Sequence, residues 1–154
     1  MRSFLLREWQ AFLRYEELPG GAPPILYLSG LGMPSHAVLA AVVAQHAVLA
    51  ARRSVFIDLL GCGFSDAPDD FDYTLEQHTR TVAMLLDHLG VAGCDVAGYS
   101  MGGAVAITLA ATRPDLVSRL ALLEANLDPL GPGEGAISTG IACQTEEAFC
   151  AEGF

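Results

Sequence analysis

Gly98-Tyr99-Ser100-Met101-Gly102, followed by Gly103, is the stretch of sequence that says most about the fold. It matches the pattern G-x-S-x-G, in which a serine stands on a sharp turn between a strand and a helix. Glycine two positions before and after the serine removes side chains that would collide where the chain folds back on itself. The turn exposes the serine oxygen, and the following helix directs N–H groups and a positive dipole end toward it. The pattern therefore predicts that Ser100 is a nucleophile.

The residues on either side of this motif agree with that interpretation. A strand candidate, Asp95-Val96-Ala97, precedes it, and a helix of small residues follows to about Arg113, where Pro114 ends it. The alternative is a plain strand-to-helix turn in which the serine only caps the helix. The context favours the nucleophile, because the pattern requires a strand before it and a helix after it.

Strands and helices alternate along the rest of the chain. Residues 4–15 are expected to form a hairpin, and the apolar run Ile25-Leu26-Tyr27-Leu28 is typical of a strand buried on both faces. The further expected segments are a helix over residues 34–51, a strand over 54–58, a helix over 74–89 and a strand over 117–123. This order predicts an α/β fold with a mostly parallel sheet and flanking helices.

Three loops, each directly after an expected strand, resemble those of the α/β-hydrolase fold family. They are Leu28-Ser29-Gly30-Leu31-Gly32, the loop from Asp58 to Asp66, and the loop from Gly98 to Gly103. Their order and spacing are similar to those of serine-nucleophile members over about residues 4–124. The resemblance implies that residues 1–126 are the N-terminal part of the hydrolase core and that residues 127–154 begin a cap or linker.

The resemblance also implies a partial fold, because the family's last strands and their covering helices are missing. A truncated or partial gene product is the simplest explanation. The strand near Leu120 would then be an open, apolar edge of the sheet, through which self-association or pairing with another chain is expected.

The same resemblance assigns catalytic groups. Ser100 attacks the acyl carbon, and the backbone N–H groups of Leu31 and Met101 form the oxyanion hole. Ser29 stands where the family usually has histidine, a change that leaves the Leu31 backbone donor in place. Glu124 has the position of the triad acid in some members, the haloalkane dehalogenases among them. Asp128 is a rival, and the third alternative is that neither is the acid.

The catalytic histidine is the gap in this assignment, because no histidine follows Ser100. The family carries that residue near the end of a longer chain. His36 is the alternative base, whereas His46, His78 and His88 are expected to be surface or hydrogen-bonded residues. Without a base, a serine hydroxyl stays protonated and is a poor nucleophile.

Three hypotheses about function therefore stay open. The first is a serine hydrolase of ester or similar acyl bonds, of which this chain is an incomplete copy. The second is a non-catalytic fragment that is inactive or pairs with a partner chain. The third is a complete small enzyme that uses His36 as its base.

The loop from Asp58 to Asp66 is expected to be architectural, with both carboxylates accepting hydrogen bonds from backbone N–H groups. Its alternative is a pair of carboxylates for acid/base chemistry. Nothing else in the sequence supports glycosidase or metal chemistry, and the resemblance implies neither a metal nor an organic cofactor.

Charge and cysteine content limit the remaining classes. The 154 residues include eight arginines and no lysine, and the net charge of -10 argues against nucleic acids and anionic membranes as partners. No segment reaches the roughly 18 apolar residues of a membrane span, and residues 1–8 do not resemble a secretory signal. The four cysteines contain no CxxC pair, which favours reduced thiols in a cytoplasm over a disulfide framework or zinc site.

Overall fold

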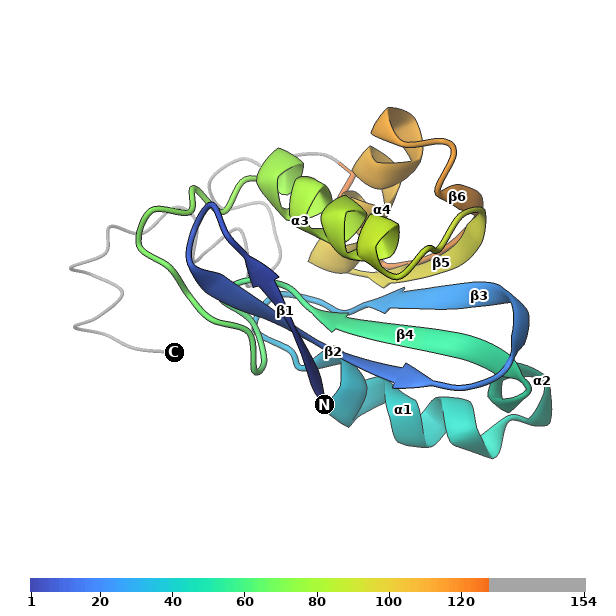
Figure 1. Cartoon of the computed structure of the whole chain (residues 1–154). Coiled ribbons are helices and arrows are strands. Elements are labelled where there is room, and N and C mark those ends of the chain that lie inside the picture. The colour runs from blue at the N-terminus through green and yellow to red at the C-terminus, as the bar shows by residue number, and fades with distance from the viewer. Residues whose placement is uncertain (128–154) are drawn as a thin grey trace.

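The computed structural model describes residues 1–127, which form a six-stranded sheet between two layers of helices (Figure 1). The strands are β1 (Arg2–Leu6), β2 (Ala11–Leu18), β3 (Gly21–Leu28), β4 (Arg52–Asp58), β5 (Cys94–Tyr99) and β6 (Val117–Leu123). Their order across the sheet is β1-β2-β4-β3-β5-β6. The pairs β1–β2 and β2–β4 are antiparallel, whereas β4, β3, β5 and β6 run parallel. The expected α/β fold with a mostly parallel sheet is confirmed.

The helices cover both faces of this sheet. Helices α1 (Ser35–Gln45) and α2 (Ala47–Ala50) lie on one face, and α3 (Leu75–His88) and α4 (Met101–Thr112) lie on the other (Figure 1). The prediction of one helix over residues 34–51 is wrong, because His46 is extended, with φ -103° and ψ 106°, and separates α1 from α2. Helix α3 begins after Thr74, whose side chain accepts a hydrogen bond from the Gln77 N–H at 3.3 Å.

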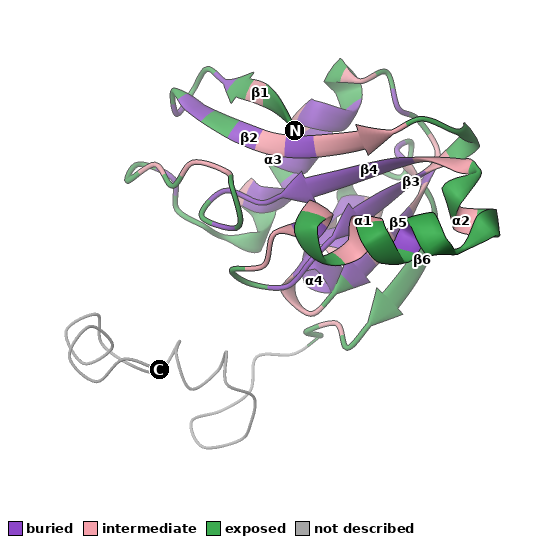
Figure 2. Ribbon diagram, turned by 90° about the horizontal axis from the view of Figure 1, so that it is seen from below, coloured by how far each residue is buried: buried purple, intermediate pink, exposed green. Residues whose placement is uncertain are grey.

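Two apolar cores lie on opposite faces of the sheet, and alternate residues of β3 belong to each. Leu26 and Leu28 pack in the larger core with α3 and α4. Ile25 and Tyr27 pack in the smaller core with Val43 of α1. Figure 2 shows the buried central strands and the largely exposed outer side of α1. The short apolar run is therefore a central strand, as expected for a run without polar alternation.

The carboxyl ends of β3, β4 and β5 lie at the same level of the sheet. Leu28 pairs with Ile57 on one side and with Gly98 on the other. Because parallel strands all end at the same edge, the loops that follow these three strands gather there, where ligands of open α/β sheets bind. The three loops that resemble the hydrolase family are thus neighbours in space.

Strand β6 is the last strand on the β5 side of the described sheet. It pairs with β5, and its side chains Leu120, Leu122 and Leu123 are 38%, 43% and 56% exposed. Within residues 1–127 the outer edge of the sheet is thus open and apolar. The predicted cap or linker over residues 127–154 lies, apart from Leu127, outside the described residues.

Candidate active site

Ser100 lies on the sharp turn that joins β5 to α4. Its φ of 52° and ψ of -121° fall outside the regions that residues with side chains normally adopt. Such strain costs on the order of 1–3 kcal/mol and persists only where the surrounding structure holds it. Here the Ser100 N–H donates to Leu123 O at 3.0 Å, and the Gly103 N–H donates to Ser100 O at 2.9 Å. The strained turn predicted from the sequence is present, while the nucleophilic role of Ser100 stays a prediction.

The two glycines of the pattern are required by close backbone contacts. A Cβ atom at Gly98 would lie 2.7 Å from Gly102 O, and one at Gly102 would lie 2.4 Å from Leu28 O. Both obstacles are backbone atoms, which cannot rotate away as a flexible side chain could. Glycine at these positions therefore lets α4 start directly against the end of β3.

The two segments expected to supply oxyanion donors both adjoin Ser100. Met101 is the first residue of α4, and a helix leaves its first N–H groups without acceptors inside the helix. The loop after β3 approaches from the other side, since a Cβ at Gly30 would lie 3.3 Å from Ser100 Cβ. That loop carries Leu31, which is 54% exposed, and closes with a hydrogen bond from the Met33 N–H to Gly30 O at 3.2 Å. Donation from Leu31 and Met101 to an oxyanion stays a prediction.

Ser29 stabilises this loop from within the core. Its Oγ lies 2.7 Å from Met33 O and 2.8 Å from Ser35 Oγ, and its N–H donates to Ser35 Oγ at 3.1 Å. Ser35 in turn donates from its Oγ to Ile57 O at 2.6 Å and from its N–H to Asp58 Oδ1 at 2.6 Å. These short polar side chains thus connect the loop after β3 to the end of β4. They start from Ser29, which stands where the family usually has histidine.

Both carboxylates of the loop after β4 hold backbone groups. Asp58 is buried and, besides Ser35, accepts the Phe64 N–H at 3.0 Å. Asp66 Oδ2 accepts the Phe12 N–H of β2 at 2.8 Å. These contacts are the architectural role expected from the sequence, and they leave the alternative of an acid/base carboxylate pair without support.

Cys62, in the loop after β4, is buried and contacts the loop after β3. Its Sγ accepts the Gly32 N–H at 3.3 Å. Burial raises the pKa of the Cys62 thiol, the nearby charge of Asp58 raises it as well, and the Gly32 hydrogen bond only partly offsets these effects. Since the thiolate is the reactive form of cysteine, these effects make Cys62 less reactive than an exposed cysteine.

Glu124, the predicted acid, directly follows β6. It is exposed and has a φ of 47°, so the chain turns sharply there. Within residues 1–127 the group that accepts a hydrogen bond from Ser100 Oγ is not Glu124 but the side chain of Asn126, with 3.2 Å between Oγ and Oδ1. The role of Glu124 stays a prediction, and its rival Asp128 lies outside the described residues.

Asn126 is not among the site residues predicted from the sequence. Two facts place it beside Ser100: β6 is the neighbour of β5, and the chain bends at Glu124, directly after β6. The first could have been inferred from the strand order of the family. The second depends on the positive φ of Glu124, which no sequence pattern predicts.

The structure gives no support to His36 as the base. The ring of His36 lies against Phe56 of β4, with 6.1 Å between the ring centroids. Strand β3 separates β4 from β5, so Phe56 and β5, the strand directly before Ser100, are two strand spacings apart, roughly 10 Å. His46 and His88 are exposed, as expected.

The expectation of a surface or hydrogen-bonded histidine is wrong for His78. Its side chain is buried in α3 beside Phe71, with 5.1 Å between the ring centroids. Within the part of the chain that the structure describes, Nδ1 of His78 has no hydrogen-bond partner. Burial lowers the pKa of His78, and the charge of Asp72 partly opposes this.

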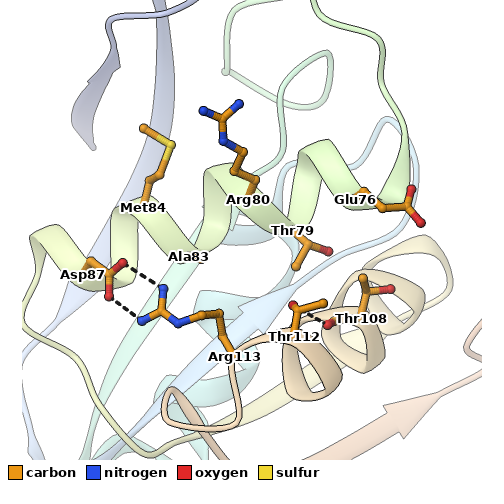
Figure 3. Close-up of a pocket in the computed structure, with 9 residues that line it drawn as sticks. All are labelled: Glu76, Thr79, Arg80, Ala83, Met84, Asp87, Thr108, Thr112 and Arg113. Carbon is orange, nitrogen blue, oxygen red and sulfur yellow. Dashed lines mark hydrogen bonds and ion pairs between the residues drawn. The ribbon is translucent and has the colours of Figure 1, made fainter.

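A groove of about 330 Å³ lies between α3 and α4 (Figure 3). Arg113 closes one end through two hydrogen bonds to the Asp87 carboxylate, at 2.8 and 2.9 Å. Thr79 and Thr108 line the walls from the two helices. Ser100 does not line this groove, so its volume is not that of a substrate pocket at the nucleophile.

Residues 1–127 contain no group of three or more His, Cys, Asp or Glu side chains that could hold a metal ion. Among the same residues, none of the helices has the length and apolar character needed to cross a membrane.

Comparison with known proteins identifies the family. The profile described as "alpha/beta hydrolase fold" matches residues 23–139. The chain therefore belongs to the α/β-hydrolase fold family, and the resemblance seen in its three loops is confirmed.

Three similar proteins illustrate the relationship. The chain is 40% identical over 114 residues to the dihydrolipoyllysine-residue acetyltransferase component of the acetoin cleaving system of Pseudomonas putida, covering 72% of this chain and 29% of that protein. It is 34% identical over 128 residues to the mouse sn-1-specific diacylglycerol lipase ABHD11, covering 80% and 39%. Among solved structures, the enol-lactonase from Burkholderia xenovorans LB400 superposes with a TM-score of 0.67 at 31% identity, covering 80% and 46%.

These figures also show that the chain spans less than half the length of each of these three proteins. Its six-stranded sheet is accordingly a partial α/β-hydrolase fold. Family membership and the lipase relative support a hydrolytic function.

Proposed function

We propose that this chain is the nucleophile-bearing part of a serine hydrolase that acts on an ester or similar acyl bond. The observation that carries the proposal is the strained turn at Ser100, which has a positive φ and lies between the start of α4 and the loop after β3. Strain of this kind is concentrated at functional sites, where the surroundings hold it in place. A serine that only caps a helix does not need it.

The proposed reaction is acyl transfer to Ser100. Its Oγ forms a bond to the acyl carbon, the carbonyl electron pair moves onto oxygen, and the Oγ proton passes to a base. The N–H groups of Leu31 and Met101 stabilise the negative oxygen. When the carbonyl re-forms, the bond to the leaving alcohol breaks and the alcohol takes up the proton. Water then hydrolyses the acyl-enzyme by the same steps.

The names of the relatives support an acyl substrate. They refer to an acetyltransferase component, a diacylglycerol lipase and an enol-lactonase. Transfer of an acetyl group, cleavage of a glycerol ester and opening of a lactone all proceed through attack on an acyl carbon. Ser100 is the proposed nucleophile for any of these reactions, so the bond type is proposed here and the substrate is left unspecified.

The acid and base complete the proposal. Glu124 follows β6 at the edge of the sheet where Ser100 lies, and we assign it the role of orienting a histidine. None of the four histidines of this sequence follows Ser100, so the proposed base is a histidine that the 154 residues do not include. On its own, the chain is expected to react only slowly at Ser100, because a serine hydroxyl without a base stays protonated.

A second candidate is a non-catalytic chain that associates with a partner through β6. The open edge of the described sheet favours it, because Leu122 and Leu123 are 43% and 56% exposed there. An unpaired, apolar edge strand is a template for pairing with another chain. In this case Ser100 would have no chemical role.

Acetylation of Ser100 by p-nitrophenyl acetate, measured by mass spectrometry in the parent chain and in Ser100→Ala, separates the two candidates. Turnover is not the measure, because the residual acceleration of a triad enzyme without its base, on the order of 10³-fold over water, comes from the oxyanion hole and binding and does not need the serine. The serine hydrolase proposal predicts an acetyl group on Ser100 of the parent chain and none at this position in Ser100→Ala. No acetylation of Ser100, together with association that increases with concentration in sedimentation velocity, would support the non-catalytic candidate instead.

A further inference from the structure

The Ser100 hydroxyl has a hydrogen-bond partner that the proposed mechanism does not use. Its Oγ donates to Asn126 Oδ1 at 3.2 Å. The Asn126 N–H also lies 3.4 Å from Ser100 O and donates to it. Two hydrogen bonds, one from the side chain and one from the backbone, therefore join the strained turn to the segment after β6.

That segment is held against the start of α4 by the fold. Leu123 O accepts the Ser100 N–H at 3.0 Å, and Glu124 then adopts a φ of 47°. Ala125 packs so closely on α4 that a Cβ at Gly103 would lie 2.5 Å from Ala125 Cβ. The position of Asn126 is thus fixed by the hydrogen bond to Leu123 and by the contact between Ala125 and α4, although its own side chain is on the surface.

The chemistry of an amide limits what this contact can do. The Oδ1 atom of asparagine accepts a hydrogen bond but does not take up the proton at neutral pH. A hydrogen bond to the neutral form of an acid favours that form. The contact therefore holds the Ser100 hydroxyl in one orientation and disfavours its alkoxide.

We propose that Asn126 is a positioning residue that holds the Ser100 proton in the resting site and occupies the direction from which a base removes it. This inference rests on the proposed function of Ser100. In the resting site the Oγ proton points to Asn126 Oδ1. For attack, that bond breaks, the proton passes to a base, and the Oγ electron pair forms the bond to the acyl carbon. The amide is the acceptor at rest and is not the base.

Replacing the amide by a carboxylate of the same shape tests this directly. In Asn126→Asp the introduced carboxylate can take the proton that the amide cannot. With a fluorophosphonate probe, the Oγ–P bond then forms, the P–F bond breaks, fluoride leaves, and the Oγ proton moves to the carboxylate. We expect Asn126→Asp to react with the probe at least about tenfold faster than the parent chain.

The pH profile distinguishes this role from a merely structural one. The gain in Asn126→Asp should appear as the pH rises through the range in which a carboxyl group ionises, about pH 4, and Asn126→Ala should show no such step. Leu127→Asp is the matched control for charge, since it adds the same carboxylate at the next residue, whose side chain is 72% exposed. That variant should react at the rate of the parent chain.

A second measurement does not depend on reactivity. In the isotope-labelled 154-residue chain, Ser100→Ala should shift the NMR signals of the Asn126 side-chain amide, because it removes the hydroxyl donor. If those signals do not shift, the proposed contact is absent and the inference is overturned. It is also overturned if the contact is present but Asn126→Asp reacts no faster than Leu127→Asp.

These outcomes are separable from failure of the proposed function. If the parent chain proves inert toward acyl esters while the amide signals shift and Asn126→Asp gains reactivity at Ser100, the inference stands and the hydrolase proposal for the parent chain fails. If the parent hydrolyses esters through Ser100 but Asn126→Asp gains nothing, the hydrolase proposal stands and the inference fails.

Discussion

Gly102→Ala is the substitution for which sequence propensity and tertiary structure make opposite predictions. Gly102 is the second residue of α4 and lies against the backbone at the end of β3. By helix propensity alone, alanine in place of glycine stabilises a helix by up to about 1 kcal/mol. A variant that differs by one methyl group therefore tests whether the packing of α4 on β3 determines stability at this point.

The expected size of the effect comes from the contact distances. The added Cβ would lie 2.4 Å from Leu28 O and 2.5 Å from Ser29 O, whereas ordinary contacts begin at 3.4 Å. Helix α4 or the end of β3 must therefore move by about 1 Å, and both are fixed by backbone hydrogen bonds. Because overpacking costs about 1–3 kcal/mol, we expect the clash to exceed the gain in propensity and to lower the free energy of unfolding by about 2 kcal/mol.

Urea denaturation followed by circular dichroism measures this change. Gly21→Ala is the matched control, because a Cβ at Gly21 would lie 3.5 Å from Ala51 O, an ordinary contact, and its effect should stay within about 0.5 kcal/mol. The reasoning is refuted if Gly102→Ala is as stable as the parent chain or more stable, as propensity predicts. The same shift should also slow ester hydrolysis by about 10²-fold, since a displacement of about 1 Å misplaces Met101.

Three further predictions concern other parts of the molecule. Asp58→Asn should lower the free energy of unfolding by about 1–3 kcal/mol, because an NH₂ group would face one of the N–H groups of Ser35 and Phe64; an unchanged urea midpoint would contradict the architectural role. Burial lowers the pKa of His78 in the folded chain, so below about pH 6.5 the unfolded chain binds more protons than the folded chain. The free energy of unfolding should therefore decrease as the pH is lowered through this range, by up to about 1.4 kcal/mol per pH unit. His78→Gln should reduce that slope, and equal slopes would refute the assignment. Leu122→Lys should weaken any self-association through β6, measured by sedimentation velocity, whereas Val48→Lys on the exposed side of α2 should not.

The elements around the site could be predicted because their signals are local. Glycine on both sides of Ser100 is required by contacts within the turn and with the adjoining strand, so the pattern itself carries the geometry. The apolar run from Ile25 to Leu28 lacks polar alternation because both of its faces are buried. That no histidine follows Ser100 can also be seen directly in the sequence.

Other features could not be predicted because they depend on contacts between distant residues. Asn126 contacts Ser100 because β6 lies beside β5 and the chain bends at Glu124. The hydrogen bonds of Ser29 and Ser35 connect the loop after β3 to Asp58 of the next strand, and serine at those positions has no special pattern. As a polar residue in an amphipathic helix, His78 is expected on the surface, yet tertiary packing buries it.

The claim on which the account depends is that the turn between β5 and α4 makes Ser100 the reactive serine of this chain. Fluorophosphonate treatment of the folded chain, followed by mass spectrometry of its peptides, measures this directly, with the exposed Ser118 as an internal reference. The account predicts one adduct, on Ser100, that is lost when the chain is unfolded in urea before treatment. Labelling of Ser118 as fast as Ser100, or no adduct on Ser100 in the folded chain, would contradict it.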